Sequence, residues 1–253
     1  MPERILLKLG GSVITDKSGD CAIDHAAISR LAGVIGSRPR TSLLIVHGAG
    51  SCGHPEAKRY RIAEGLDGSN LAGVFATHRS VLRLNDALVE ALRENGLEAI
   101  GISPIAAAVT DNGRIKSFAS GPLEEMLGRH MVPVLHGDVV MDCSRGASIV
   151  SGDQLTRFLA VALCANRVGL ATDVPGVIDQ ERVVRVITPE NAGDIELEGS
   201  GHPDVTDGMR GKINELLMLA REGVPSDIFH ASRLADFLDG RPHGGTRVVA
   251  DAR

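Results

Sequence analysis

Four short segments combine glycines or other small residues with an ionisable side chain. Each follows an apolar run typical of a buried strand: residues 8–12, 48–54, 151–153 and 172–174. Such loops let backbone N–H groups converge on an anion, and ligands of open α/β sheets bind at the carboxyl ends of the strands. A tight turn would explain any one loop, but four together predict an anion site.

The lysines near these loops suggest the chemistry. Lys8 interrupts the apolar run of residues 4–9, where an unpaired ammonium is costly, so we expect it to reach the loop end and meet an anion. Lys17 follows the first glycine loop, and Lys212 lies early in a predicted helix; a solvated surface position would explain either one. Asp153 would serve as a helix N-cap or as an acceptor that fixes a lysine. Converging lysines without a nucleophile–base pair favour phosphoryl transfer, which depends on positioning and charge neutralisation.

His54 follows the second glycine loop and would touch the bound anion. A helix cap or a hydrogen bond to the backbone would also explain it. Three further histidines, at 47, 136 and 230, end predicted strands and are interpreted as structural, and Cys52 as a packing residue.

Residues 48–53 match the dinucleotide pattern G-x-G-x-x-G. That pattern normally closes the first strand of a domain and is followed by an acidic residue at the end of the next strand. Here it follows the second predicted strand, and Glu64 and Asp67 fall in a glycine-rich loop, so a dehydrogenase is disfavoured. Walker A and G-x-S-x-G sequences are absent.

Alternating strands and helices must position these residues. We expect strands near residues 4–9, 43–46, 98–103, 132–136, 167–171, 226–231 and 246–249, with a hairpin turn at 111–113. Helices are expected from Asp24 onward, from His54 onward, and over 78–95, 121–130 and 154–165, with a mobile loop at 65–73. The pattern predicts an α/β fold with a mainly parallel sheet. We expect a single domain over residues 1–253, with two lobes that meet near residue 165.

Composition limits the class of protein. The 253 residues are 43% hydrophobic, with a net charge of −5, no basic block and only six aromatic residues (five Phe and one Tyr). Neither a nucleic-acid partner nor a membrane span is expected. The four cysteines are scattered, which indicates reduced thiols and a cytoplasmic enzyme.

Eight segments resemble the isopentenyl phosphate kinases of the amino acid kinase superfamily, and they extend over nearly the whole chain. They are residues 5–17, 46–62, 77–85, 133–142, 151–155, 172–177, 204–213 and 245–248. The Gly-His-Pro segment at 53–55 and the Ser-Gly-Asp-Gln-Leu segment at 151–155 are specific to this branch.

The resemblance implies a three-layer α/β/α sandwich with a mainly parallel central sheet. The acceptor would bind in the N-terminal lobe, about 1–165, and ATP in the C-terminal lobe, about 166–253. The implied reaction is transfer of a phosphoryl group from ATP to isopentenyl phosphate, in the alternative mevalonate route to isoprenoids. Mg²⁺ would accompany ATP without a dedicated carboxylate cage, and a homodimer is expected.

Matching positions imply individual roles. Lys8 and Lys17 would neutralise the transferring phosphoryl group, with Lys17 stabilising the transition state. His54 would hydrogen-bond the acceptor phosphate, Gly152 would contact the substrate, and Asp153 would organise the lysines.

The same matching implies a bridge between acceptor and donor, formed by Ala49 and Gly50. The expected ATP-binding residues are Lys8, Gly10, Gly11, Ser12, Gly50, Asp173, Ile178, Gly208 and Lys212.

Three positions depart from the family pattern. Cys52 replaces a usual Phe, Pro175 a usual Asp, and Asp207 a usual Gly. The last two bear on adenine and ribose binding, and Cys52 on the acceptor pocket. The alternatives are a kinase of another small phosphate or phosphonate, such as fosfomycin, a kinase of a carboxylate, and a non-catalytic nucleotide-binding protein.

Overall fold

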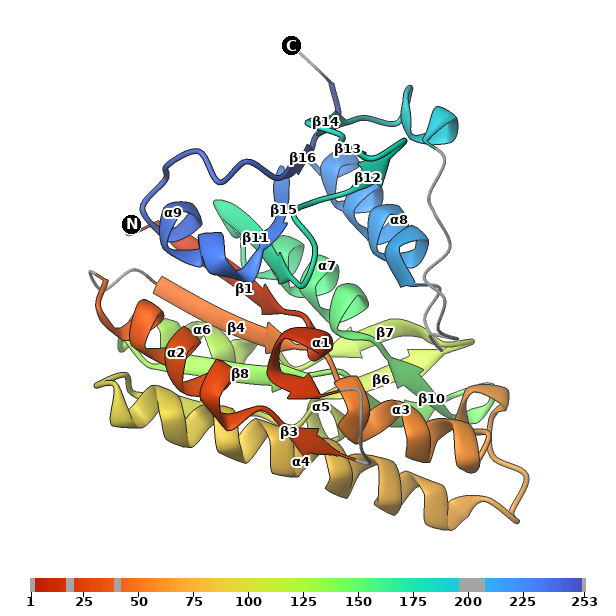
Figure 1. Cartoon of the computed structure of the whole chain (residues 1–253). Helices are drawn as coiled ribbons and strands as arrows, with labels where there is room; N and C mark the ends of the chain where they lie inside the picture. Colours follow the sequence, from red (N-terminus) through yellow and green to blue (C-terminus); the bar gives the residue numbers. More distant parts are fainter. Residues whose placement is uncertain (1–2, 17–20, 39–41, 196–207, 252–253) are drawn as a thin grey trace.

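The apolar runs assemble into one eight-stranded sheet at the centre of the molecule (Figure 1). The computed structural model describes residues 3–16, 21–38, 42–195 and 208–251. The strands lie in the order β14 (Val186–Ile187), β16 (Thr246–Val248), β15 (Ser226–His230), β11 (Arg167–Thr172), β1 (Arg4–Leu9), β4 (Ser42–His47), β8 (Val132–His136) and β5 (Ala99–Gly101). Within this sheet the neighbouring strands run parallel, except β15 and β16. The predicted mainly parallel sheet is confirmed.

Helices cover both faces of the sheet, because its strands are apolar on both sides. On one face Ile5 and Leu7 pack with α2 (His25–Gly36), α4 (Leu71–Glu94) and α9 (Leu234–Leu238). On the other, Leu6 packs with α6 (Gly121–Gly128), α7 (Gly152–Ala162) and α8 (Gly208–Arg221). Side chains alternate along a strand, so Lys8 shares the face of Leu6 and points toward α7 and α8. The three-layer α/β/α sandwich is confirmed.

A smaller sheet lies beside this sandwich (Figure 1). Its order is β10 (Gly146–Val150), β9 (Asp138–Asp142), β6 (Ala108–Asp111) and β7 (Arg114–Phe118). The predicted hairpin joins β6 to β7 through Asn112 and Gly113, with φ of 50° and 78°. Positive φ at both central residues is what a tight hairpin turn requires. The other α-helices and strands of the described residues are α1 (Gly11–Ile14), α3 (Gly50–Arg59), α5 (Pro104–Ala107), β2 (Thr15–Asp16), β3 (Ala22–Ile23), β12 (Ile178–Asp179) and β13 (Arg182–Val183).

Helix α3 begins at Gly50, four residues before the predicted start at His54, and contains Pro55. Proline has no N–H to bond the carbonyl four residues earlier, which belongs to Ser51. That carbonyl accepts instead from the backbone N–H of Cys21, at 3.1 Å. A contact from outside the helix therefore replaces the bond that proline removes.

Helix α4 begins at Leu71, seven residues before the predicted start. The buried Asn70 side chain donates to the carbonyls of Tyr60 and Gly65, at 3.1 and 2.8 Å, and accepts from Asp67 N–H. These bonds fasten the segment before the helix, so the loop predicted over 65–73 is wrong from residue 71 onward.

Cys21 and Cys52 form a disulfide across 31 residues, with Cα atoms 3.8 Å apart. The prediction of four reduced thiols is therefore wrong for this pair, whereas Cys143 and Cys164 are free and exposed. Only the folded chain brings β3 beside α3, so sequence spacing could not reveal the bond. None of the helices in the described part of the chain combines the length and apolar character needed to cross a bilayer.

Candidate active site

Two lysines from different elements meet one carboxylate at the carboxyl end of the central strands. Lys8 Nζ, from β1, lies 2.7 Å from Asp153 Oδ1 in the first turn of α7. Lys212 Nζ, from α8, lies 3.4 Å from both oxygens of the same carboxylate. The side chain of Lys8 is only 6% exposed, that of Asp153 12% and that of Lys212 13%. The structure thus brings together three of the predicted site residues.

The electrostatics of this cluster favour a further anion. Burial lowers the pKa of Lys8 to about 8, and the attraction of Asp153 opposes that shift. Burial would raise the pKa of Asp153, but Lys212 and Lys8 together lower it to about 2. Two ammonium groups against one carboxylate leave an excess positive charge in a nearly dry position, which a phosphate would balance.

The glycine loops after β1 and β4 touch each other backbone to backbone. A Cβ on Gly11 would lie 2.5 Å from Gly50 Cα, and a Cβ on Gly48 would lie 2.7 Å from Gly11 N, so neither position has room for a side chain. Thr15 ties the loops together: its hydroxyl donates to Gly11 O at 2.8 Å and accepts from Ser51 N–H at 3.1 Å. Gly50 has a φ of +53°, the left-handed region that favours glycine.

Gly152 joins this arrangement from the start of α7. A Cβ there would lie 3.1 Å from both His47 O and Lys8 Cε. The end of β4, the Lys8 side chain and the N-terminus of α7 therefore meet, as predicted for strand-end loops of one sheet.

Three residues predicted to contact the acceptor lie at the start of α3. Ala49 is its N-cap, Gly50 opens it, and the half-buried His54 follows one turn later. Gly10 and Ser12 flank Gly11 in the loop after β1; Gly10 N–H donates to Ala171 O at 2.8 Å, and the Ser12 side chain is exposed.

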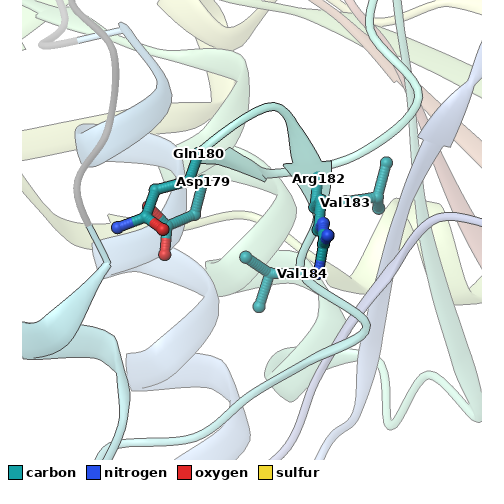
Figure 2. A pocket seen from close by; sticks show the side chains of 5 residues that line it. All are labelled: Asp179, Gln180, Arg182, Val183 and Val184. Carbon is teal, nitrogen blue, oxygen red and sulfur yellow. The ribbon is translucent and has the colours of Figure 1, made fainter.

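Three further residues predicted to bind the nucleotide lie at three separate elements. Asp173 is exposed just after β11, and Gly208 opens α8. Ile178 begins the β12–β13 hairpin. A pocket of about 450 Å³ lies at this hairpin. Figure 2 shows the residues that line it: Asp179, Gln180, Arg182, Val183 and Val184. Lys17 and Asp207 lie outside the described residues.

A histidine cluster lies under the strand ends. His47 and His136 are fully buried with ring centroids 5.6 Å apart, and burial lowers the pKa of each to about 4, so both are neutral. His78 Nδ1 donates to Asp138 at 2.9 Å, and this hydrogen bond raises the pKa of His78. The burial of His47 and His136 agrees with a structural role, and sequence reasoning missed the pairing of His78 with Asp138.

Sequence reasoning also missed a charged cluster formed by Arg114, Arg157 and Glu215. One signal was available: Arg157 follows Asp153 by four residues and Glu215 follows Lys212 by three, which are the spacings of one helix face. The contact of Arg114 with Glu215 spans 101 residues and leaves no trace in local sequence.

Comparisons with known proteins identify the family of this chain. The model of the amino acid kinase family matches residues 3–230. The chain is 40% identical to the isopentenyl phosphate kinase of Methanothermobacter thermautotrophicus, over 97% of this chain and 98% of that protein. It is 38% identical to the isopentenyl phosphate kinase of Haloferax volcanii, over 95% and 96%. A solved isopentenyl phosphate kinase structure, 38% identical, superposes with a TM-score of 0.86 over 98% of this chain and 100% of that one. The chain belongs to the amino acid kinase family, on the branch of the isopentenyl phosphate kinases.

Proposed function

We propose that the protein transfers the γ-phosphoryl group of ATP to isopentenyl phosphate, giving isopentenyl diphosphate and ADP. The observation that carries this proposal is the buried Lys8–Asp153–Lys212 cluster beside the two touching glycine loops. It provides excess positive charge and a side-chain-free approach in one place. Those are the requirements of a reaction in which positioning and charge neutralisation do most of the work.

In the proposed reaction an oxygen of the acceptor phosphate attacks the γ-phosphorus of ATP in line. The bond from that phosphorus to the β–γ bridging oxygen breaks, and ADP leaves with the electron pair. Lys8 neutralises the transferring group from β1, and Lys212 does so from α8. Asp153 holds both ammonium groups beside the transferring phosphoryl group through its ion pairs with Lys8 and Lys212. Lys17 stabilises the charge that develops in the transition state.

The loops supply backbone contacts to both substrates. Residues 10–12 line the ATP phosphates, with Asp173, Ile178 and Gly208 on the nucleotide side. Ala49 and Gly50 lie between donor and acceptor, where a larger residue at 50 would strike Thr15 and Gly11. His54 hydrogen-bonds the acceptor phosphate, and Gly152 allows the acceptor to approach α7.

Magnesium is part of this proposal as a companion of ATP. In the described ranges no three His, Cys, Asp or Glu side chains form a group that could hold a metal ion. Asp153, the carboxylate at the lysines, has both oxygens engaged by ammonium groups. These residues fit an ion held mainly by phosphate oxygens and water, while the lysines supply the remaining positive charge.

The larger assignments are also proposals. We infer an acceptor lobe over about 1–165 and a nucleotide lobe over about 166–253 within one domain. A homodimer is supported by Leu71 and Phe75, which lie one turn apart on α4 and are 58% and 70% exposed. Light scattering on the purified protein would test it. In a cytoplasmic location, the Cys21–Cys52 bond would have to resist reducing conditions.

The test is a kinase assay that compares isopentenyl phosphate with dimethylallyl phosphate, fosfomycin, acetylglutamate and aspartate. We expect the highest kcat/KM with isopentenyl phosphate. His54→Ala should raise KM for this acceptor and lower kcat while leaving Tm nearly unchanged. Preference for fosfomycin or a carboxylate would replace the proposed acceptor. ATP binding without turnover of any acceptor would indicate a non-catalytic protein.

A further inference from the structure

Glu215 is the buried centre of a charge cluster that the proposed reaction does not use. The residue is only 8% exposed, on α8. Its Oε1 accepts from Arg114 Nη1 and its Oε2 from Arg114 Nη2, at 3.1 Å for the second, so the guanidinium is bidentate. Arg157 Nε lies 3.0 Å from Oε2 as a second ion pair. Burying a carboxylate is costly unless it is paired, so these two arginines stabilise the buried position of Glu215.

Like the active-site pair of Lys212 with Asp153, the pair of Glu215 with Arg157 joins helix α8 to helix α7. Asp153 and Arg157 lie four residues apart on α7, and Lys212 and Glu215 lie three apart on α8. Residues at these spacings share one helix face. The helices are therefore joined by two neighbouring ion pairs, Lys212–Asp153 and Glu215–Arg157. A rotation of α8 that moved Glu215 would also move Lys212.

The third partner ties this pair of helices to the acceptor lobe. Arg114 belongs to the β6–β7 hairpin, which is also bonded by Gln154, the residue after Asp153. The Gln154 side chain accepts from Ile115 N–H at 2.9 Å and donates to Gly113 O at 3.0 Å. The hairpin thus contacts both α7 and α8 directly beside the site.

Asp142 makes this hairpin a firm support. Its carboxylate accepts from the N–H groups of Asn112 and Gly113 in the turn, at 3.2 and 2.7 Å, and from Ser144 and Arg145 in the next turn. Burial opposes ionisation, but these bonds lower the pKa of Asp142. Arg114 therefore follows directly after a turn whose two central residues are both hydrogen-bonded to Asp142.

We propose that Glu215 is a positioning residue for phosphoryl transfer. Held by Arg114 and Arg157, it fixes the rotation of α8 so that Lys212 stays at Asp153 and at the transferring phosphoryl group. This role rests on the proposed function of Lys212. It assigns the β6–β7 hairpin the task of coupling the acceptor lobe to the nucleotide helix.

The test begins with Glu215→Gln, which keeps the shape of the side chain and removes its charge. We expect kcat to fall about tenfold and KM for ATP to rise, with KM for isopentenyl phosphate within about twofold of wild type. A matched control is Arg129→Ala, which breaks the exposed Arg129–Glu125 pair on α6 and should change neither constant.

A double-mutant cycle with Lys212→Ala separates positioning from simple stabilisation. If Glu215 acts through Lys212, then adding Glu215→Gln to Lys212→Ala should lower kcat by less than about twofold further. A further tenfold loss of kcat in the double variant would overturn the positioning role of Glu215 but leave the proposed function of Lys212 intact. Wild-type turnover by Lys212→Ala would overturn the function proposed for Lys212, and this inference with it. Unchanged kcat and KM in folded Glu215→Gln would overturn the inference directly.

A second pair of variants carries the test if Glu215→Gln does not fold. Arg114 lies outside both helices and its side chain is 47% exposed, so its replacement leaves the helix packing intact. Arg114→Ala should reproduce the kcat loss at unchanged KM for the acceptor, and Arg114→Lys should recover part of it through a single ion pair. Equal activity of Arg114→Ala and wild type would contradict the coupling.

Discussion

Lys8 keeps its charge at a position where burial works against it. It is 5% exposed in the central strand β1, and Asp153 at 2.7 Å offsets only part of the cost of desolvation. A buried ammonium with incomplete charge compensation interacts more strongly with a bound phosphate than an exposed lysine would, because little water must be displaced. The residue is therefore charged and short of counter-charge before the nucleotide arrives.

This state of Lys8 predicts an alkaline limit to activity. The pKa of Lys8 is about 8 in the free protein, below its ordinary 10.5, so the side chain loses its proton as pH rises through 8. The neutral amine cannot bind phosphate as an ion, and kcat/KM for ATP should fall above about pH 8. Bound ATP favours the protonated form, which should move the corresponding limb of kcat to higher pH.

The control for this pH profile is Lys8→Arg. A guanidinium stays protonated throughout the range, so the alkaline limb should disappear from whatever activity the variant retains. A wild-type profile that stays flat to pH 10, or an unchanged limb in Lys8→Arg, would contradict the assignment of the limb to Lys8.

At the scale of elements, the contact between the loops after β1 and β4 leaves no space for a methyl group. Gly11→Ala would place a Cβ against the backbone of Gly50, and the hydrogen bonds of Thr15 to both loops oppose their separation. We expect kcat/KM to fall at least about 100-fold and stability to fall by about 1–3 kcal/mol, as in other overpacked sites. Steady-state kinetics and thermal unfolding would measure both effects.

The matched control for Gly11→Ala is Gly128→Ala at the end of α6. A Cβ at Gly128 would meet nothing within 4 Å, and the residue is not among those with positive φ. That variant should be neutral or slightly stabilising. Wild-type kinetics in Gly11→Ala would show that the loops separate more easily than their contacts indicate.

The Cys21–Cys52 bond joins the residue before β3 to α3, the helix that carries His54. Denatured protein that has not been reduced should show two reactive thiols, and four after reduction. Reduction should lower the free energy of unfolding by about 4 kcal/mol, since the bond closes a loop of 31 residues. Replacing the exposed Cys143 and Cys164 with serine should leave that difference unchanged; four reactive thiols before reduction would contradict the bond.

Local sequence signals predicted the central strands and the glycine loops, because an apolar run indicates a buried strand and the glycines after it indicate a turn. They failed where a distant group completes an element. Helix α3 tolerates Pro55 because Cys21 N–H bonds Ser51 O, and α4 starts early because Asn70 reaches Tyr60 and Gly65.

The candidate site follows the same division. Lys8, Asp153 and Lys212 were predicted singly, from burial cost and from positions near helix starts, and the sheet topology then brings them together. The alternative that Asp153 caps α7 is wrong, because the N-cap is Ser151, whose side chain accepts from Gln154 N–H. The Arg114–Glu215 pair could not be predicted, because it depends on how a hairpin of the small sheet lies against α8.

At the scale of the whole molecule, the two proposed lobes share one sheet and both of its cores. Strand β11, from the second lobe, lies between β1 and β15, so separating the lobes would expose the centre of the sheet. Each core also combines both halves: one holds Leu6 with Ile228, and the other holds Ile5 with Phe229. Neither lobe keeps a complete core without the other.

The chain should therefore unfold in one cooperative transition. We expect a single calorimetric peak whose enthalpy equals the van't Hoff enthalpy, and coincident loss of helix and of tertiary signals. ATP should shift that whole transition upward, because a ligand of the native state stabilises everything that unfolds with its site. A chain of residues 1–165 should fail to fold, since β1 would lose its neighbour β11. Two separate transitions, of which ATP moved only one, would show instead that the lobes are independent units that happen to adjoin.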